Sequence, residues 1–276
     1  MRSTAFLDER RHGELASRLC SVHAERTFVV RSPLDDRLIG ELPEATASDV
    51  RAAAEAARDA QHAWGALDPS FRRLAFGRLA TLLQAFEAEA ASLVHAETGI
   101  SLDQASAELG GLARAVALWS RRAPRQLRAV KQRRGLRVVA TERREPSGLV
   151  GVGSGMQHPF TEPATHATLA LLAGNAVLLR PSPGGSFSAL LLAELFEAAT
   201  LPKGLVRVVA GRGDHLDALI AEVVDQVVFD ESPELAWHCD QHGVDHLEHA
   251  GYVPVADAAI LSPTVFTRTV VRSRGG

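Results

Sequence analysis

Four histidines close together form the densest group of potential metal ligands in the sequence. They are His238, His242, His246 and His249 of the segment HCDQHGVDHLEH. On a helix these spacings would place all four on one face, and imidazoles one turn apart can share a Zn, Ni or Cu ion. Gly243 weakens a continuous helix. The pattern is typical of a solvated polar helix and loop, with a divalent metal site at these four histidines as the alternative.

The two cysteines, Cys20 and Cys239, are the candidates for thiol chemistry, and they are too few for a disulfide framework. A catalytic thiol needs a low pKa, which nearby cations or a helix N-terminus provide. Cys239 instead precedes Asp240, whose carboxylate opposes thiolate formation. We therefore expect Cys239 not to act as a nucleophile, and Cys20 to be a small apolar residue of the core.

Composition narrows the class of protein. The chain has 276 residues, of which 46% are apolar and 5% aromatic, so its core must consist mainly of Ala, Leu and Val. A net charge of −3 argues against a nucleic-acid partner bound by bulk charge. No apolar run reaches the length of a membrane span, and the first twenty residues show no secretory signal. These features predict a cytoplasmic protein that binds neither nucleic acid nor membrane.

The first half of the chain shows helical patterns after a short pair of strands. Residues 5–24 have the pattern of a charged helix, and residues 27–42 that of two strands around a turn. Three amphipathic helices are then expected at 48–63, 69–97 and 101–126. Their Ala and Leu faces predict an N-terminal helical layer.

The second half alternates strands and helices. Residues 127–145, LRAVKQRRGLRVVATERRE, predict a basic hairpin that is either a solvated patch or an interface. Apolar strands are then separated by helical segments, which is typical of a parallel sheet with crossover helices. The expected strands are 148–154, 175–183, 206–211 and 225–230, and the expected helices are 161–174, 185–199 and 213–222.

Several segments, in order and spacing, resemble the aldehyde dehydrogenase superfamily. They are REPSGLVGVGSGMQHPF, LLAGNAVLLRPSP, LPKGLVRVVAGRGDHLDAL and DQVVFDES, preceded by FVVRSPLDDRLIGELPEATASDVRAAAEAARDAQHAW and HAETGISLDQASAEL. The resemblance covers about residues 27–232. It implies an α/β fold, with a Rossmann-like doubly wound parallel sheet, an N-terminal helical layer and a projecting oligomerisation hairpin.

The resemblance also implies a division of the chain. Residues 1–126 would form the N-terminal hairpin and helical part, 127–147 the oligomerisation hairpin, and 148–232 the Rossmann-like part. Residues 233–276 would be a short divergent segment in place of most of a catalytic domain. The implied partner is a second copy of the chain or a complete homologous dehydrogenase subunit.

The family's catalytic segments are not found where the resemblance would place them. Neither the G-Q-x-C stretch of the nucleophile nor the E-L-G-G stretch of the base follows Ser232. An E-L-G-G sequence does begin at Glu108, but it precedes the cofactor region, so we interpret it as coincidence. Residues 251–271 resemble the family's G-Y-x-x-x-P-T-V-F-T segment, which suggests an internal loss of the catalytic domain.

Cofactor positions can be carried over one by one. Arg180 and Ser182 match the family's K-P-S-E strand end, and Gly211 and Gly213 match its G-x-G turn, so these four are the predicted NAD(P)-binding residues. An arginine at position 180 would favour a 2′-phosphate. The alternative is that Arg180 pairs with a nearby acid. Gln157 replaces the asparagine of the oxyanion loop and is a vestigial catalytic candidate at most.

Other positions depart from the family pattern in ways that weaken dinucleotide binding. Pro183 replaces the glutamate that would bind ribose, and Asp217 replaces an expected glycine. Asp230 and Glu231 stand where the family has Thr-Gly, and their charge would repel a pyrophosphate. The sequence thus favours a structural or regulatory pseudoenzyme. The alternative is a divergent NAD(P)-dependent oxidoreductase, or an enzyme using the His238–His249 cluster with residues from a partner.

Overall fold

Five parallel strands form the central sheet of the computed structural model. It describes residues 7–21, 26–134, 137–213, 215–230, 233–249 and 262–273. The strands lie in the order β7-β6-β5-β8-β9, so the chain moves outward from β5 in one direction and then returns to extend the sheet in the other. The sequence predicted this doubly wound parallel arrangement, but not the edge strand at 245–249. The strands are β5 (Leu149–Ser154), β6 (Ala176–Pro181), β7 (Val206–Val208), β8 (Gln226–Asp230) and β9 (Asp245–His249).

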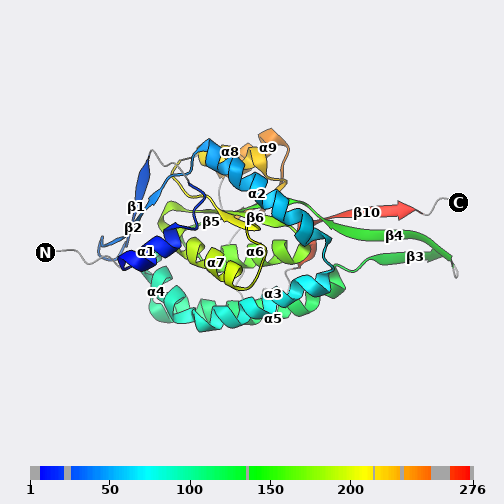
Figure 1. The fold of residues 1–276 in the computed structure, drawn as a ribbon, viewed down its shortest axis with the longest axis horizontal. Coiled ribbons are helices and arrows are strands. Elements are labelled where there is room, and N and C mark those ends of the chain that lie inside the picture. Colours follow the sequence, from blue (N-terminus) through cyan, green and yellow to red (C-terminus); the bar gives the residue numbers. More distant parts are fainter. Residues whose placement is uncertain are drawn as a thin grey trace.

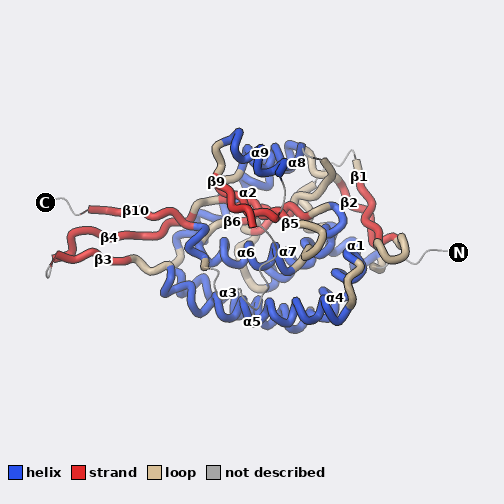
Figure 2. Tube along the Cα trace, turned by 180° about the vertical axis from the view of Figure 1, so that it is seen from behind, coloured by secondary structure: helices blue, strands red, loops and turns tan. Residues whose placement is uncertain are grey.

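Helices cover both faces of this sheet (Figures 1 and 2). One face carries α6 (Thr161–Ala173) and α7 (Ser186–Ala198), with a short 3-10 turn η1 (Pro183–Gly185) before α7. A further layer packs on α6 and α7 from outside. Every residue of α6 is therefore buried between sheet and helices. The outer layer consists of α3 (Pro69–Ala85), α4 (Glu87–Thr98) and α5 (Leu102–Gln126), and the opposite face carries α2 (Ala47–Ala66), α8 (His215–Val223) and α9 (Pro233–His242).

Two expectations about the helices are wrong. The helix expected at 48–63 is α2, but it contacts β6 and α8 on the far face of the sheet and does not join the other N-terminal helices. Its buried alanines, such as Ala53 and Ala57, permit this close approach to the strands. The helix expected at 69–97 is two helices, because the backbone at Phe86 leaves the helical region between α3 and α4.

A three-stranded antiparallel arm projects from the end of the body opposite the N-terminus (Figure 1). The predicted hairpin is present as β3 (Val130–Arg134) and β4 (Arg137–Pro146), joined by the unforeseen β10 (Thr267–Ser273). β10 pairs with β4 from Pro146 to Ala140, so β4 is the central strand. A 3-10 turn, η3 (Pro263–Phe266), leads into β10, and its Phe266 carbonyl accepts a hydrogen bond from the buried Asn175 at 3.0 Å.

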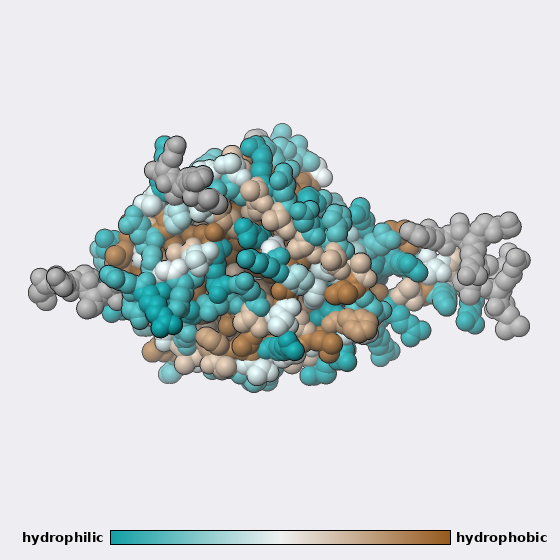
Figure 3. All heavy atoms as spheres, in the orientation of Figure 1, coloured by the Kyte–Doolittle hydropathy of each residue, from teal (hydrophilic) through white to brown (hydrophobic). Residues whose placement is uncertain are grey.

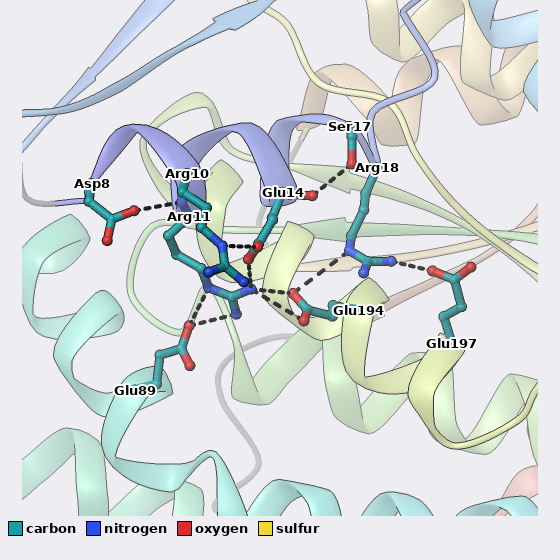
Figure 4. A network of polar contacts seen from close by, with 9 residues as sticks. All are labelled: Asp8, Arg10, Arg11, Glu14, Ser17, Arg18, Glu89, Glu194 and Glu197. Atoms are coloured by element: carbon teal, nitrogen blue, oxygen red, sulfur yellow. Dashed lines mark hydrogen bonds and ion pairs between the residues drawn. The ribbon is translucent and has the colours of Figure 1, made fainter.

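The N-terminal helix is held by ion pairs (Figure 4). It is shorter than expected, spanning α1 (Glu9–Ala16), and lies beside the small sheet of β1 (Thr27–Arg31) and β2 (Leu38–Pro43). Arg11 reaches Glu89 of α4 at 2.6 Å and Glu194 of α7 at 2.9 Å. Arg18 pairs with Glu197. The helix thus bridges the outer and inner helical layers.

Arg72 of α3 is a buried cation that makes no hydrogen bond to a carboxylate among the described residues. Its side chain is 4% exposed and donates to the carbonyls of Leu172 and Ala173 at 3.0 and 3.2 Å. It also donates to the carbonyls of Gly65 and Leu67 at 3.1 and 2.9 Å. Burial lowers its pKa to about 10, so it stays charged at neutral pH. Arg72 satisfies the carbonyls at the C-terminal end of α6, where a positive charge is favourable.

Glu97 of α4 meets the N-terminal end of a helix, whereas Arg72 meets a C-terminal end. Its carboxyl group is fully buried and accepts from the backbone N–H groups of Phe187 and Ser188 at 2.8 and 3.1 Å. These amides belong to the first turn of α7, which otherwise would have no acceptor. The desolvation of the buried carboxyl raises its pKa to about 8.

We predict that Arg72→Met destabilises the protein by roughly 3 kcal/mol, because four carbonyls lose their shared donor in the interior. Urea unfolding followed by circular dichroism measures the change. Arg73→Met is the matched control, because Arg73 is the exposed neighbour on the same helix. Equal stability of the two variants would contradict the role assigned to Arg72.

We also predict that the stability difference between the wild type and Glu97→Gln shrinks as pH rises. The folded-state pKa of about 8 lies above the ordinary carboxyl value of 4.5, so the native state holds the proton more tightly. The wild type therefore loses stability between these two values, while the glutamine variant lacks this dependence. Urea unfolding at intervals from about pH 5 to about pH 8.5 tests this. A difference that grows with pH would show that the native group is the carboxylate.

Candidate functional site

The carboxyl ends of β5 and β6 carry the loops where a doubly wound sheet normally binds its ligand. Residues 155–160 follow β5, and Gln157 is exposed on this loop. Ser182, directly after β6, donates from its hydroxyl to the Gly155 carbonyl at 3.3 Å. A Cβ on Gly184 would lie 2.6 Å from the Met156 sulfur, so the Met156 side chain packs directly against the backbone at this glycine. The loop after β5 is thus held against the start of α7.

Arg180 is engaged by an ion pair with Asp217 of α8. Its Nε lies 2.8 Å from Oδ1 of Asp217 and its Nη2 3.5 Å from Oδ2. The remaining terminal nitrogen donates to the Pro181 carbonyl at 2.8 Å. The two side chains are only 13% and 12% exposed. This is the pairing that the sequence left as an alternative for Arg180, and the acid is the residue that replaces an expected glycine.

The predicted glycine turn lies between β7 and α8. Gly211 is buried, with Ala45 and Leu216 next to it. Gly213 is exposed and adopts φ +89°, which L side chains rarely accept. Gly211 and Gly213 thus serve the turn into α8.

The sequence positions assigned to a dinucleotide already make contacts within the chain. Each guanidinium nitrogen of Arg180 donates to an acceptor of the chain. The hydroxyl of Ser182 donates to Gly155, and the first-turn amides of α7 donate to Glu97. The two terminal nitrogens of Arg180 carry four N–H groups, of which these contacts use two, and the Ser182 oxygen can still accept. The assignment of Arg180, Ser182, Gly211 and Gly213 to cofactor binding therefore stays a prediction.

Cys239 is packed inside the body on α9. Its side chain is fully buried, and burial, with the nearby carboxylates of Asp240 and Asp217, raises its pKa to about 11. Cys20 is also buried, with a raised pKa. A thiol with a raised pKa is a poor nucleophile near neutral pH. Both cysteines thus behave as core residues.

The four clustered histidines do not share one helix, so the helical spacing argument for them is wrong. His238 and His242 belong to α9, which ends at His242, whereas His246 and His249 belong to strand β9. The break is at Gly243, which adopts φ +64°. Among the described side chains, no three His, Cys, Asp or Glu residues are arranged to hold a metal ion. The side chains of His246 and His249 lie outside those described, so a metal site remains a prediction.

A contact between His158 and Glu108 was not anticipated. The His158 Nδ1 lies 3.0 Å from a carboxylate oxygen of Glu108, and both side chains are largely buried. Glu108 begins the E-L-G-G sequence interpreted as coincidence, and His158 follows Gln157. The pair links α5 to the loop after β5. No local sequence signal could reveal it, because the partners are fifty residues apart.

In the part of the chain that the structure describes, no helix combines the length and apolar character needed to span a bilayer.

Comparison with known proteins gives one consistent family. The aldehyde dehydrogenase family matches residues 21–244. The chain is 33% identical over 187 residues to the N-succinylglutamate 5-semialdehyde dehydrogenase of Burkholderia lata, covering 68% of this chain and 38% of that protein. It is 32% identical over 196 residues to the malonate-semialdehyde dehydrogenase of Pseudomonas aeruginosa, covering 71% and 39%.

Comparison with solved structures indicates the same family. The NAD-dependent aldehyde dehydrogenase of Sinorhizobium meliloti superposes with a TM-score of 0.77 at 30% identity, covering 84% of this chain and 48% of that one. The chain thus spans about half the length of this solved relative and about two fifths of the curated ones. With the doubly wound sheet, the arm and the family match over most of its residues, the chain belongs to the aldehyde dehydrogenase family.

Proposed function

We propose that this chain has no aldehyde oxidation of its own and acts as a structural or regulatory subunit. The observation that carries the proposal is the state of its two thiols, since both are buried and neither has a lowered pKa. Family chemistry requires a thiolate that attacks the aldehyde, and these residues do not supply one. The internally paired Arg180 supports the same conclusion.

The arm supports a role in association. β3, β4 and β10 extend away from the body, and β3 pairs only with β4 among the described strands. Long exposed strand edges are usually covered or paired in natural proteins. The occupant we propose is a complete homologous dehydrogenase subunit or a second copy of this chain.

A divergent NAD(P)-dependent oxidoreductase is the second candidate. It is favoured by the named activities of the relatives, one of which is an NAD-dependent aldehyde dehydrogenase. Under this proposal a bound nucleotide would contact Arg180 beside its pair with Asp217 or in place of it. An assay of aldehyde-dependent cofactor reduction distinguishes the two candidates.

We predict that the isolated chain forms no NADH or NADPH from aliphatic or aromatic aldehydes. We also predict that ADP-ribose binds about as well as NAD(P), because the nicotinamide half gains no contact. The measurements are absorbance at 340 nm and a competition titration, with a complete dehydrogenase as the positive control. Aldehyde-dependent reduction above a blank without protein, lost in Cys239→Ala, would establish the second candidate.

We predict that the chain sediments as a dimer or larger assembly, alone or with a complete family dehydrogenase. The exposed Val130 at the start of β3 is the test position, since Val130→Asp places a charge on the free edge. We expect it to weaken assembly about ten-fold. Val29→Asp on β1, another exposed strand valine, is the matched control. If the chain stays monomeric at micromolar concentration, both alone and with the dehydrogenase, the argument for an interface at the arm fails.

A further inference from the structure

Basic side chains gather where α5 passes into the arm. A recess of about 630 Å³ is lined by Arg125, Arg128, Lys131 and Arg133, together with Ala129 and Val130, and no carboxylate lines it. All four cations are exposed. The charged residues that line this recess are therefore all positive and accessible to solvent.

A second recess of about 500 Å³ continues from the first and shares Arg128 with it. It adds Arg143 and Arg144 of β4. Its one acidic lining residue, Asp68, caps α3 by accepting from the backbone N–H of Ser70 at 2.8 Å. We call the two recesses together the root groove, because they follow the root of the arm.

The cations of the root groove are not neutralised from within the described part of the chain. None of them takes part in an ion pair there. The sequence explains this, because residues 114–145 hold eleven basic and two acidic residues in a protein of net charge −3. A concave surface lined by one sign of charge attracts the opposite charge and raises its local concentration. Besides the buried Arg72, which also lines the second recess, the six exposed cations are Arg125, Arg128, Lys131, Arg133, Arg143 and Arg144.

Apolar residues beside the cations indicate which kind of ligand the root groove can bind. Leu67 lines the second recess and is 42% exposed, and Val130 lines the first and is 58% exposed. Prolines 69, 124 and 146 also line the second recess, and no residue lining either recess is aromatic. Proteins that bind single-stranded nucleic acid stack its bases on aromatic side chains. Acidic polypeptides with apolar side chains match this surface better.

The outer edge of β3 gives such a polypeptide a backbone partner. Residues 130, 131 and 133 of β3 line the first recess, and β3 has no second neighbour among the described strands. An extended peptide can add to such an edge through main-chain hydrogen bonds. Figure 3 shows hydrophilic side chains along the described arm, with apolar ones near its root.

We propose that the root groove binds an acidic segment of a partner protein that carries apolar side chains among its carboxylates. Two root grooves facing each other would bring like charges together, so a second copy cannot meet this surface with its own groove. This inference rests on the associating role proposed above and states the chemistry of the partner.

The probe is a fluorescein-labelled synthetic peptide of about fourteen residues, in which Asp and Glu alternate and every fourth position is Leu. Its binding to the full chain is followed by fluorescence anisotropy. We expect saturable binding that weakens steeply as salt is raised from about 50 to about 300 mM. A peptide with Gln and Asn in place of Glu and Asp should not bind.

The test variant is Arg128→Glu with Lys131→Glu, and the matched control is Arg51→Glu with Lys203→Glu. Both pairs exchange one exposed Arg and one exposed Lys, so the net charge is the same. We expect the affinity for the peptide to fall at least about ten-fold in the test variant and less than about three-fold in the control. Circular dichroism and unfolding midpoints confirm that both variants fold.

An equal loss of peptide affinity in both variants would show that the peptide is attracted by the overall charge of the protein, and this would overturn the proposal. Binding of duplex DNA or anionic phospholipid vesicles in preference to the peptide would overturn it in favour of those classes. Sedimentation of the unsubstituted chain with a complete dehydrogenase, compared with its peptide binding, separates the two proposals. Assembly without peptide binding would refute the acidic partner alone, whereas peptide binding by a chain that never associates with a dehydrogenase would refute only the choice of subunit made above.

Discussion

One buried guanidinium and one buried carboxyl group fix the outer helical layer on the inner one, and the geometry of the rest depends on them. Arg72 of α3 binds the carbonyls at the end of α6, and Glu97 of α4 binds the amides at the start of α7. Each side chain meets the helix end whose free backbone groups it can satisfy, because the guanidinium donates to carbonyls and the carboxyl group accepts from amides. Apolar contacts between Ala- and Leu-rich helices tolerate sliding, whereas hydrogen bonds to named carbonyls and amides do not. These contacts therefore set how the layers align.

This alignment positions the features that bear on function. α5 belongs to the outer layer, and its Glu108 reaches His158 on the loop after β5. The C-terminal end of α5 leads directly into β3, so the same helix also sets where the arm leaves the body. The arm is held a second way, since Asn175, at the end of α6, donates to the Phe266 carbonyl just before β10. The loop at the sheet and the arm are thus attached to one framework of helices.

The sequence predicted those elements whose pattern is local. Alternating apolar strands and helices gave the parallel sheet, and Gly174 was correctly expected to end α6, where it adopts φ +103°. Elements that depend on distant partners were missed. β10 carries β-branched residues, but its partner strand β4 lies more than a hundred residues earlier, so no local pattern indicates the pairing. The expectation that the clustered histidines share one helix was wrong for a related reason. β9 forms because β8 offers an edge, and this tertiary pairing overrides the helical spacing of the histidines.

The cationic side chains at the two ends of the molecule differ in whether a carboxylate of the described chain pairs with them, and this difference affects what each end can bind. At the carboxyl end of the sheet, Arg180 meets Asp217, and the Ser182 hydroxyl donates to the Gly155 carbonyl. A ligand that displaces either contact gains only the difference between its own contacts and those it breaks. At the root of the arm, Arg125, Arg128 and their neighbours make no ion pair within the described part of the chain, so a partner's carboxylates add to the binding free energy without that offset. The two ends of the molecule therefore differ in what a negatively charged partner has to displace.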